Sequence, residues 1–151
     1  MNKTSWKFTC IFVLTSLTPF FGLKAAEGEK SLYDRLGGKP AVQAVAGGLV
    51  DSILLDNRVN GWFAHAASSP ANATAYKEKL AEFICQNTGG PCKYPGQDMV
   101  TAHKGRGVTS EAFDAVVQDL VAVLEKFKVP EREKNELLGI LGPLKTSIVQ
   151  H

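Results

Sequence analysis

Between residues 31 and 148, the apolar residues of this chain recur at the spacing of an α-helix and never alternate as in a β-strand. An apolar stripe of this kind is buried by packing one helix against another, which favours an all-α fold. The 151 residues are enough for one domain, and no repeat or linker divides them. The sequence therefore predicts a single all-α domain.

Capping residues and glycine or proline breaks delimit six helical segments. In the first half of the chain, we expect a short helix between Ser31 and Gly37-Gly38, a helix from about Pro40, and a helix from Ser68-Ser69-Pro70 to Gly89-Gly90-Pro91. A short helix is expected over 97–104. A fifth helix is opened by Thr109-Ser110 and has an apolar stripe reaching Phe127, and a last helix is opened by Pro130 and kinked at Pro143.

The first 25 residues are typical of a secretory signal peptide. Lys3 and Lys7 precede an apolar stretch over 8–17, and small residues around Ala25 fit a cleavage site. The stretch is too short to span a bilayer comfortably. We expect an exported domain, periplasmic or secreted, over residues 26–151, frayed at 26–30 and with no membrane attachment once the leader is removed. An uncleaved amphipathic anchor is the alternative.

The charge balance argues against a nucleic-acid partner. Lys3, Lys7 and Lys24 lie in the leader, so 14 of the 17 basic residues remain beside 15 acidic ones. A nearly neutral domain has no basic footprint for nucleic acid or an anionic membrane. A small molecule, a cofactor or a neutral surface is the expected partner.

Two cysteines, Cys85 and Cys92, remain when the leader with Cys10 is removed. Gly89, Gly90 and Pro91 between them can turn the chain back, and an oxidising compartment favours a disulfide. Two free buried thiols are equally compatible with the sequence.

Motifs for nucleophilic hydrolysis, phosphate loops and dinucleotide binding are missing from the chain. Among the three histidines, His103 is distinctive because it follows Met99 by one turn on a helix too short to be stable alone in water. A metal bound to its imidazole would hold that helix. A core histidine bonded to a carbonyl is the alternative.

Five segments, in order, resemble the group I truncated haemoglobins. Residues 94–108 are similar to the region around that family's haem-binding histidine, and residues 31–38 (SLYDRLGG) to its opening motif. Phe63 falls at the corner phenylalanine, residues 88–91 at the glycine pair that closes helix E, and Val129-Pro130 at the boundary of helices G and H. The resemblance runs from about Ser31 to Val149.

This resemblance implies a two-over-two helical sandwich that holds a haem iron through His103. One ring nitrogen would bind iron while the other donates to a backbone carbonyl. The chain lacks C-x-x-C-H, the motif of covalent haem attachment, so haem b held without a covalent bond is expected. The residues expected to contact haem are Phe63, Tyr76, Lys79, Leu80, Ile84, Tyr94, Met99, His103, Val108 and Phe113.

The distal pocket, formed by Val50, Tyr76 and Leu80, departs from the family pattern. Val50 stands where many members have a tyrosine that donates to bound O₂. Tyr76 is then the phenol available as donor, unless its ring only covers the haem edge. Lys79 falls where some relatives place an internal iron ligand, and it either ligates the iron or pairs with a haem propionate.

The resemblance implies reversible binding of O₂ or another diatomic gas, NO or CO. Oxygen binding or transport is favoured over catalysis, because NO-detoxifying or redox turnover needs a reductant and the sequence shows no flavin or nicotinamide module. The alternative is a helical metal-binding or interaction module without haem, in which Cys85, Cys92 and a histidine are ligands.

Overall fold

The computed structural model describes residues 28–150, so the expected leader lies outside the described residues. The α-helices are α1 (Leu32–Leu36), α2 (Gly38–Leu55), α3 (Ala64–Ala67), α4 (Pro70–Asn87), α5 (Met99–His103), α6 (Ser110–Lys126), α7 (Glu131–Leu141) and α8 (Lys145–Ile148). Two 3₁₀-helices, Asn60–Phe63 and Gly142–Leu144, connect them. No β-strand occurs within residues 28–150.

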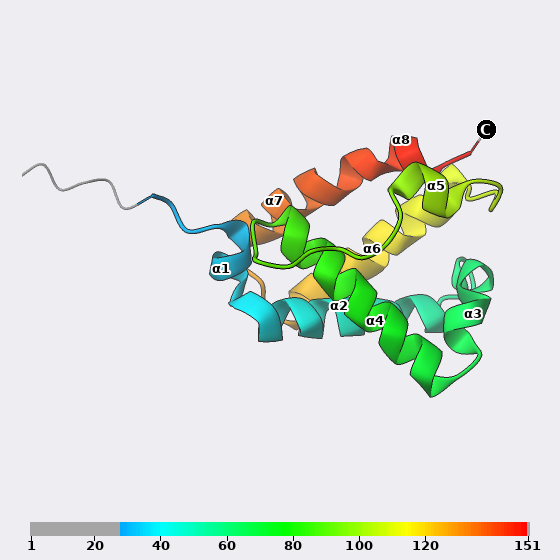
Figure 1. Ribbon diagram of the computed structural model, residues 1–151, viewed down its shortest axis with the longest axis horizontal. Helices are drawn as coiled ribbons and strands as arrows, with labels where there is room; N and C mark the ends of the chain where they lie inside the picture. Colours follow the sequence, from blue (N-terminus) through cyan, green and yellow to red (C-terminus); the bar gives the residue numbers. More distant parts are fainter. Residues whose placement is uncertain (1–27, 151) are drawn as a thin grey trace, which may run out of the picture.

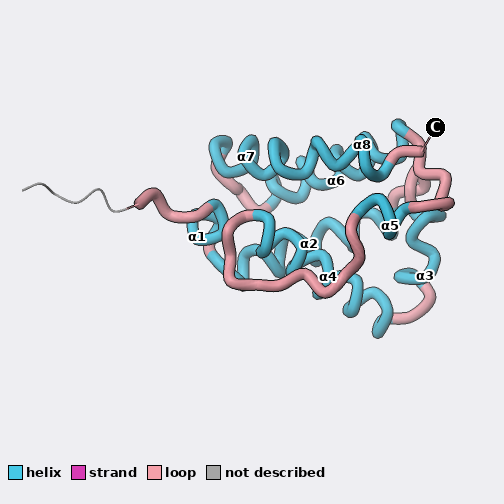
Figure 2. Tube along the Cα trace, turned by 45° about the horizontal axis from the view of Figure 1, so that its top comes forward, coloured by secondary structure: helices cyan, strands magenta, loops and turns pink. Residues whose placement is uncertain are grey.

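The long helices form two layers of two. In Figures 1 and 2, α2 and α4 cross in one layer, while α6 and the α7–α8 pair lie in the other. Ile53 of α2, Ile84 of α4, Leu124 of α6 and Leu137 of α7 are almost fully buried where the layers meet. The predicted all-α two-over-two sandwich is therefore confirmed.

The predicted helix starts are confirmed by their caps. Hydroxyl oxygens of Ser31, Ser69 and Thr109 accept hydrogen bonds from the backbone N–H groups of Asp34, Asn72 and Ala112. These bonds satisfy donors that have no partner inside the helix. Gly37 ends α1 in a left-handed conformation with φ 107°.

Some boundaries differ from the sequence prediction. Helix α2 begins at Gly38 rather than near Pro40, because proline is tolerated in a first turn. The 3₁₀-helix Asn60–Phe63 and helix α3 were not predicted, since Asn60-Gly61 indicates only a turn. Phe127 is 44% exposed rather than on the buried stripe, because α6 ends at Lys126.

The ends of the described chain are anchored on α7 and on the segment after α5. Residues 28–30 are exposed and outside any helix, yet Glu29 pairs with Arg132 of α7. At the other end, the kink predicted at Pro143 corresponds to the 3₁₀-helix between α7 and α8.

Across residues 28–150, none of the helices combines the length and apolar character needed to cross a membrane.

Candidate functional site

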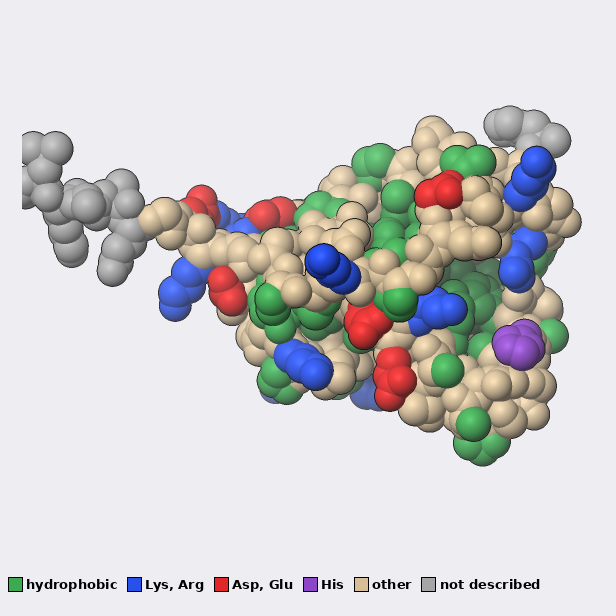
Figure 3. Space-filling model, in the orientation of Figure 1, with side chains coloured by type: hydrophobic (Ala, Val, Ile, Leu, Met, Phe, Trp, Pro, Cys, Tyr) green, Lys and Arg blue, Asp and Glu red, His purple; other side chains and the backbone are tan. Residues whose placement is uncertain are grey.

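A crevice lies beside α4 and α5, the helices that carry Tyr76 and His103. Figure 3 shows a recessed apolar area on this face, with Lys and Arg side chains beside it. In Figure 1 the area lies between α4, α5 and α3. Seven residues predicted to contact haem share one property, partial burial: Phe63, Tyr76, Leu80, Tyr94, Met99, His103 and Phe113. Such side chains leave apolar surface that a further apolar group can cover.

His103 is the last residue of α5, and its ring Nδ1 lies 2.8 Å from the carbonyl oxygen of Met99. A carbonyl oxygen only accepts, so Nδ1 carries the proton and donates it. In the neutral imidazole, this hydrogen bond leaves the lone pair on Nε2, the nitrogen that can bind a metal. Asp98 supports the helix by accepting a hydrogen bond from the N–H of Thr101 at 3.0 Å.

Tyr76 projects from α4 with its ring edge-on to Phe63, the centroids 5.6 Å apart. Burial raises the pKa of Tyr76 to about 12; the nearby Tyr94 adds to this increase and the guanidinium of Arg106 opposes it. The phenol therefore stays protonated near neutral pH. It can donate a hydrogen bond, but it does not present a phenolate.

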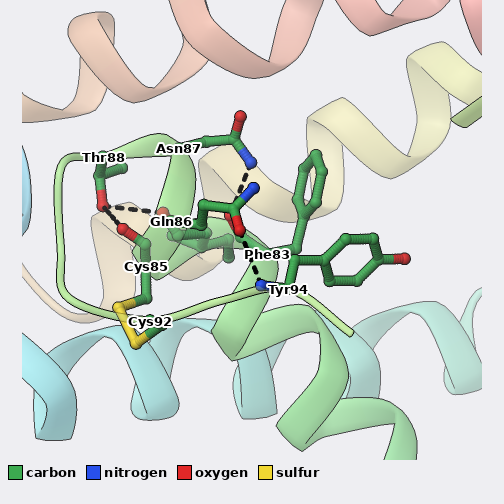
Figure 4. Close-up of a disulfide and its surroundings, with 8 residues drawn as sticks. Phe83, Cys85, Gln86, Asn87, Thr88, Cys92 and Tyr94 are labelled. Carbon is green, nitrogen blue, oxygen red and sulfur yellow. Dashed lines mark hydrogen bonds between the residues drawn. A yellow bond between two sulfur atoms is a disulfide. The ribbon is translucent and has the colours of Figure 1, made fainter. Parts of the chain in front are cut away.

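One end of the crevice is covered by the loop between α4 and α5. Figure 4 shows the disulfide between Cys85 and Cys92, the disulfide alternative of the sequence analysis, and Tyr94 two residues beyond it. The backbone N–H of Tyr94 donates to Oε1 of Gln86 at 2.8 Å. Its ring meets Phe83 edge-on at 5.1 Å. Partial burial raises the pKa of Tyr94 as well.

The other end is closed by contacts between segments distant in sequence. The indole N–H of Trp62 donates to the carbonyl oxygen of Arg106 at 3.1 Å, joining the corner before α3 to the segment after α5. The C-terminal tail holds the same segment, because the N–H of Gln150 donates to the Val108 carbonyl oxygen at 3.0 Å. Trp62 and Arg106 are site residues that the sequence analysis missed. Their only signals are that Trp62 precedes Phe63 and that Arg106 lies between two glycines.

The other predicted site residues are either more buried or more exposed than these partly buried ones. Val50 and Ile84 have 1% and 0% of their surface exposed, and Ile84 lines a separate apolar pocket of about 210 Å³ with Leu36 and Leu137. Ile84 therefore packs in the core, and its contact with haem stays a prediction. Val108 is buried beside α5, whereas Lys79 is exposed at the rim of α4.

The donor set argues against a metal held by protein groups alone. Within residues 28–150, no group of three or more His, Cys, Asp or Glu side chains is placed to hold a metal ion. Cys85 and Cys92 bond to each other, so they do not supply the thiolates of the metal-module alternative. The imidazole of His103 by itself fits an iron whose remaining ligands would come mainly from a flat macrocycle.

Comparison with known proteins identifies the family. A family model described as bacterial-like globin matches residues 31–150. The chain belongs to the bacterial-like globin family. A group 1 truncated haemoglobin of Mycolicibacterium paratuberculosis is 34% identical over 118 residues, which cover 78% of this globin and 83% of that relative.

Two solved structures share the architecture. The truncated haemoglobin of Tetrahymena pyriformis in its Fe(III) form has a TM-score of 0.71 and 25% identity, covering 81% of this globin and 100% of that chain. The 2/2 haemoglobin of Synechococcus sp. PCC 7002, in the cyanomet state with covalently attached haem, has a TM-score of 0.71 and 27% identity over the same shares. This chain is a haem-binding globin that binds diatomic ligands.

Proposed function

We propose that this globin holds haem b without a covalent bond in the crevice between α4 and α5. His103 is the protein ligand to iron, and a diatomic gas binds on the opposite side beside Tyr76. The observation that carries this proposal is the hydrogen bond from Nδ1 of His103 to the Met99 carbonyl oxygen at 2.8 Å. It fixes the tautomer and the ring orientation that a metal-binding imidazole needs.

Bound haem would supply the iron that His103 holds and that binds the gas. The surrounding side chains then have separate tasks. Phe63, Leu80 and Phe113 present apolar surface to the macrocycle and exclude water. Tyr76 donates a hydrogen bond to the bound gas. Val50, at the position of the usual donor tyrosine, has no polar group that could do so.

Lys79 pairs with a haem propionate in this proposal. It lies one turn from Tyr76 on α4 and is exposed, as expected of an ammonium group that meets a carboxylate at the crevice rim. His103 would then be the one protein ligand to the iron.

Reversible binding of O₂, NO or CO is the function proposed, with oxygen binding or transport as its use. NO detoxification would in addition need electrons from a separate reductant, so we propose no turnover by this chain alone. The signal-peptide pattern of residues 1–25 supports export to the periplasm or medium. The disulfide agrees with an oxidising compartment.

The absorption spectrum of the purified protein tests this proposal. We expect an intense Soret band, and we expect the pigment to move fully into acidified organic solvent because the haem is not covalently attached. His103→Ala should lose stable haem, whereas His65→Ala should keep it, since His65 is exposed on α3. An unchanged ferrous CO spectrum in His103→Ala would overturn the assignment of the ligand.

A further inference from the structure

The loop over residues 88–98 runs along α4 to α5 and has no helix of its own. Pro91, Lys93 and Pro95 in it are exposed, so little apolar burial holds the loop in place. Beyond the turn at its start, where the N–H of Gly90 donates to the Cys85 carbonyl oxygen at 2.8 Å, two bonds attach it to α4: the Cys85–Cys92 disulfide and the hydrogen bond from Tyr94 to Gln86. The disulfide is the covalent one of the two.

Tyr94 is the aromatic residue of this loop, and its side chain is partly buried. In Figure 4 its ring lies next to Phe83 and points away from the disulfide. The ring is packed so closely on its own loop that a Cβ added at Gly96 would come within 2.1 Å of the Tyr94 hydroxyl oxygen. Tyr94 also lies near enough to Tyr76 to affect its ionisation. The place of this ring therefore depends on the path of the loop.

We propose that the Cys85–Cys92 disulfide is a positioning element of the haem crevice: it holds Tyr94 as a cover over one end, and breaking it speeds the exchange of haem. This inference rests on the proposed function. It assigns a role in cofactor retention to two residues that touch neither iron nor gas. A bond that only stabilises the fold would act on all helices alike and would not depend on Tyr94.

The two sulfurs of the disulfide differ in solvent exposure, and this difference determines which of them a reductant attacks. Cys85 is 1% exposed, whereas Cys92 is partly exposed. The thiolate of a dithiol reductant attacks the sulfur of Cys92, and Cys85 leaves as a thiolate that takes up a proton. The second thiol of the reductant then displaces Cys92, so the reductant becomes a cyclic disulfide and the protein gains two electrons and two protons.

The first test is hydrogen exchange of the haem-free protein over residues 26–151, which lacks Cys10, with and without dithiothreitol. Because the bond closes a short loop, we expect amide exchange in residues 88–98 to speed up by about tenfold on reduction, with α2 and α6 unchanged. Cys92→Ala should match the reduced protein and should not respond to dithiothreitol. It is preferred to a change at the buried Cys85. Equal acceleration in every helix would overturn the proposal.

The second test is a double-mutant cycle on haem transfer from the ferric holoprotein to excess apomyoglobin. Loss of the Tyr94 contact should speed haem release by about fivefold in both Cys92→Ala and Tyr94→Ala. The double variant should be no faster than Tyr94→Ala, and the surface change Lys93→Ala should have no effect. Additive effects of the two changes would overturn the proposal. Absence of haem from the wild-type protein would instead refute the proposed function, an outcome separate from the exchange result.

Discussion

Tyr76→Phe tests whether the α4 phenol donates to the bound gas. The change removes one hydroxyl and keeps the ring, so the edge-on contact with Phe63 at 5.6 Å is preserved. A hydrogen bond of this kind is worth about 1 kcal/mol, which corresponds to about fivefold in a dissociation rate. We therefore expect O₂ to leave Tyr76→Phe about fivefold faster than the wild type. CO accepts hydrogen bonds weakly, and its dissociation should hardly change.

The ionisation of Tyr76 adds a pH dependence to this prediction. Burial raises the pKa of Tyr76 to about 12, so the neutral phenol is the form present throughout the physiological range. The O₂ dissociation rate of the wild type should then stay level from pH 6 to pH 10. It should approach the rate of Tyr76→Phe only near pH 12, where the phenol loses its proton.

Stopped-flow displacement of O₂ by excess CO, monitored at the Soret band, measures these rates. Tyr94→Phe is the matched control, because it removes a hydroxyl from the neighbouring ring at the edge of the crevice. Equal O₂ dissociation rates for wild type and Tyr76→Phe would refute the donor role. A wild-type rate that changes near pH 8 would show that another group governs ligand release.

Two further predictions concern Lys79 and the leader. The ferric spectrum should be unchanged in Lys79→Ala from pH 6 to pH 10, because an exposed propionate partner does not set the spin state of the iron; a low-spin alkaline form that disappears in Lys79→Ala would show ligation instead. Intact mass of the protein recovered from the producing cells should correspond to a chain beginning at Ala26, and a chain that keeps residues 1–25 would contradict cleavage.

The short-range features of this globin follow from its sequence. Ser31, Ser69 and Thr109 cap helices where the sequence predicts them, since a cap depends on neighbouring residues only. The apolar spacing predicts an all-α fold for a similar reason. With 3.6 residues per turn, the apolar residues of each segment fall on one side of their own helix. His103 is singled out by its place on a helix too short to be stable alone, and by the family resemblance of the segment around it.

Long-range contacts depend on the tertiary structure. The bond from Trp62 to the Arg106 carbonyl joins residues 44 apart, and no local pattern signals it. The sequence leaves open whether Cys85 and Cys92 bond, because only the path of the loop shows whether their sulfurs meet. The helical stripe places Ile84 on the inner face of α4, but only the tertiary structure shows that neighbours from α1 and α7 lie around it.

The same division applies to the chemistry of the crevice. The sequence by itself determined which side chains are available: one imidazole on a short helix, one phenol on α4 and no tyrosine at position 50. The hydrogen bond of His103 to the Met99 carbonyl is also local, because both residues belong to α5. Only the tertiary structure decided the surroundings of Tyr76, whose pKa is raised by burial beside Phe63. Burial shifts a pKa, and burial is a property of the packed chain.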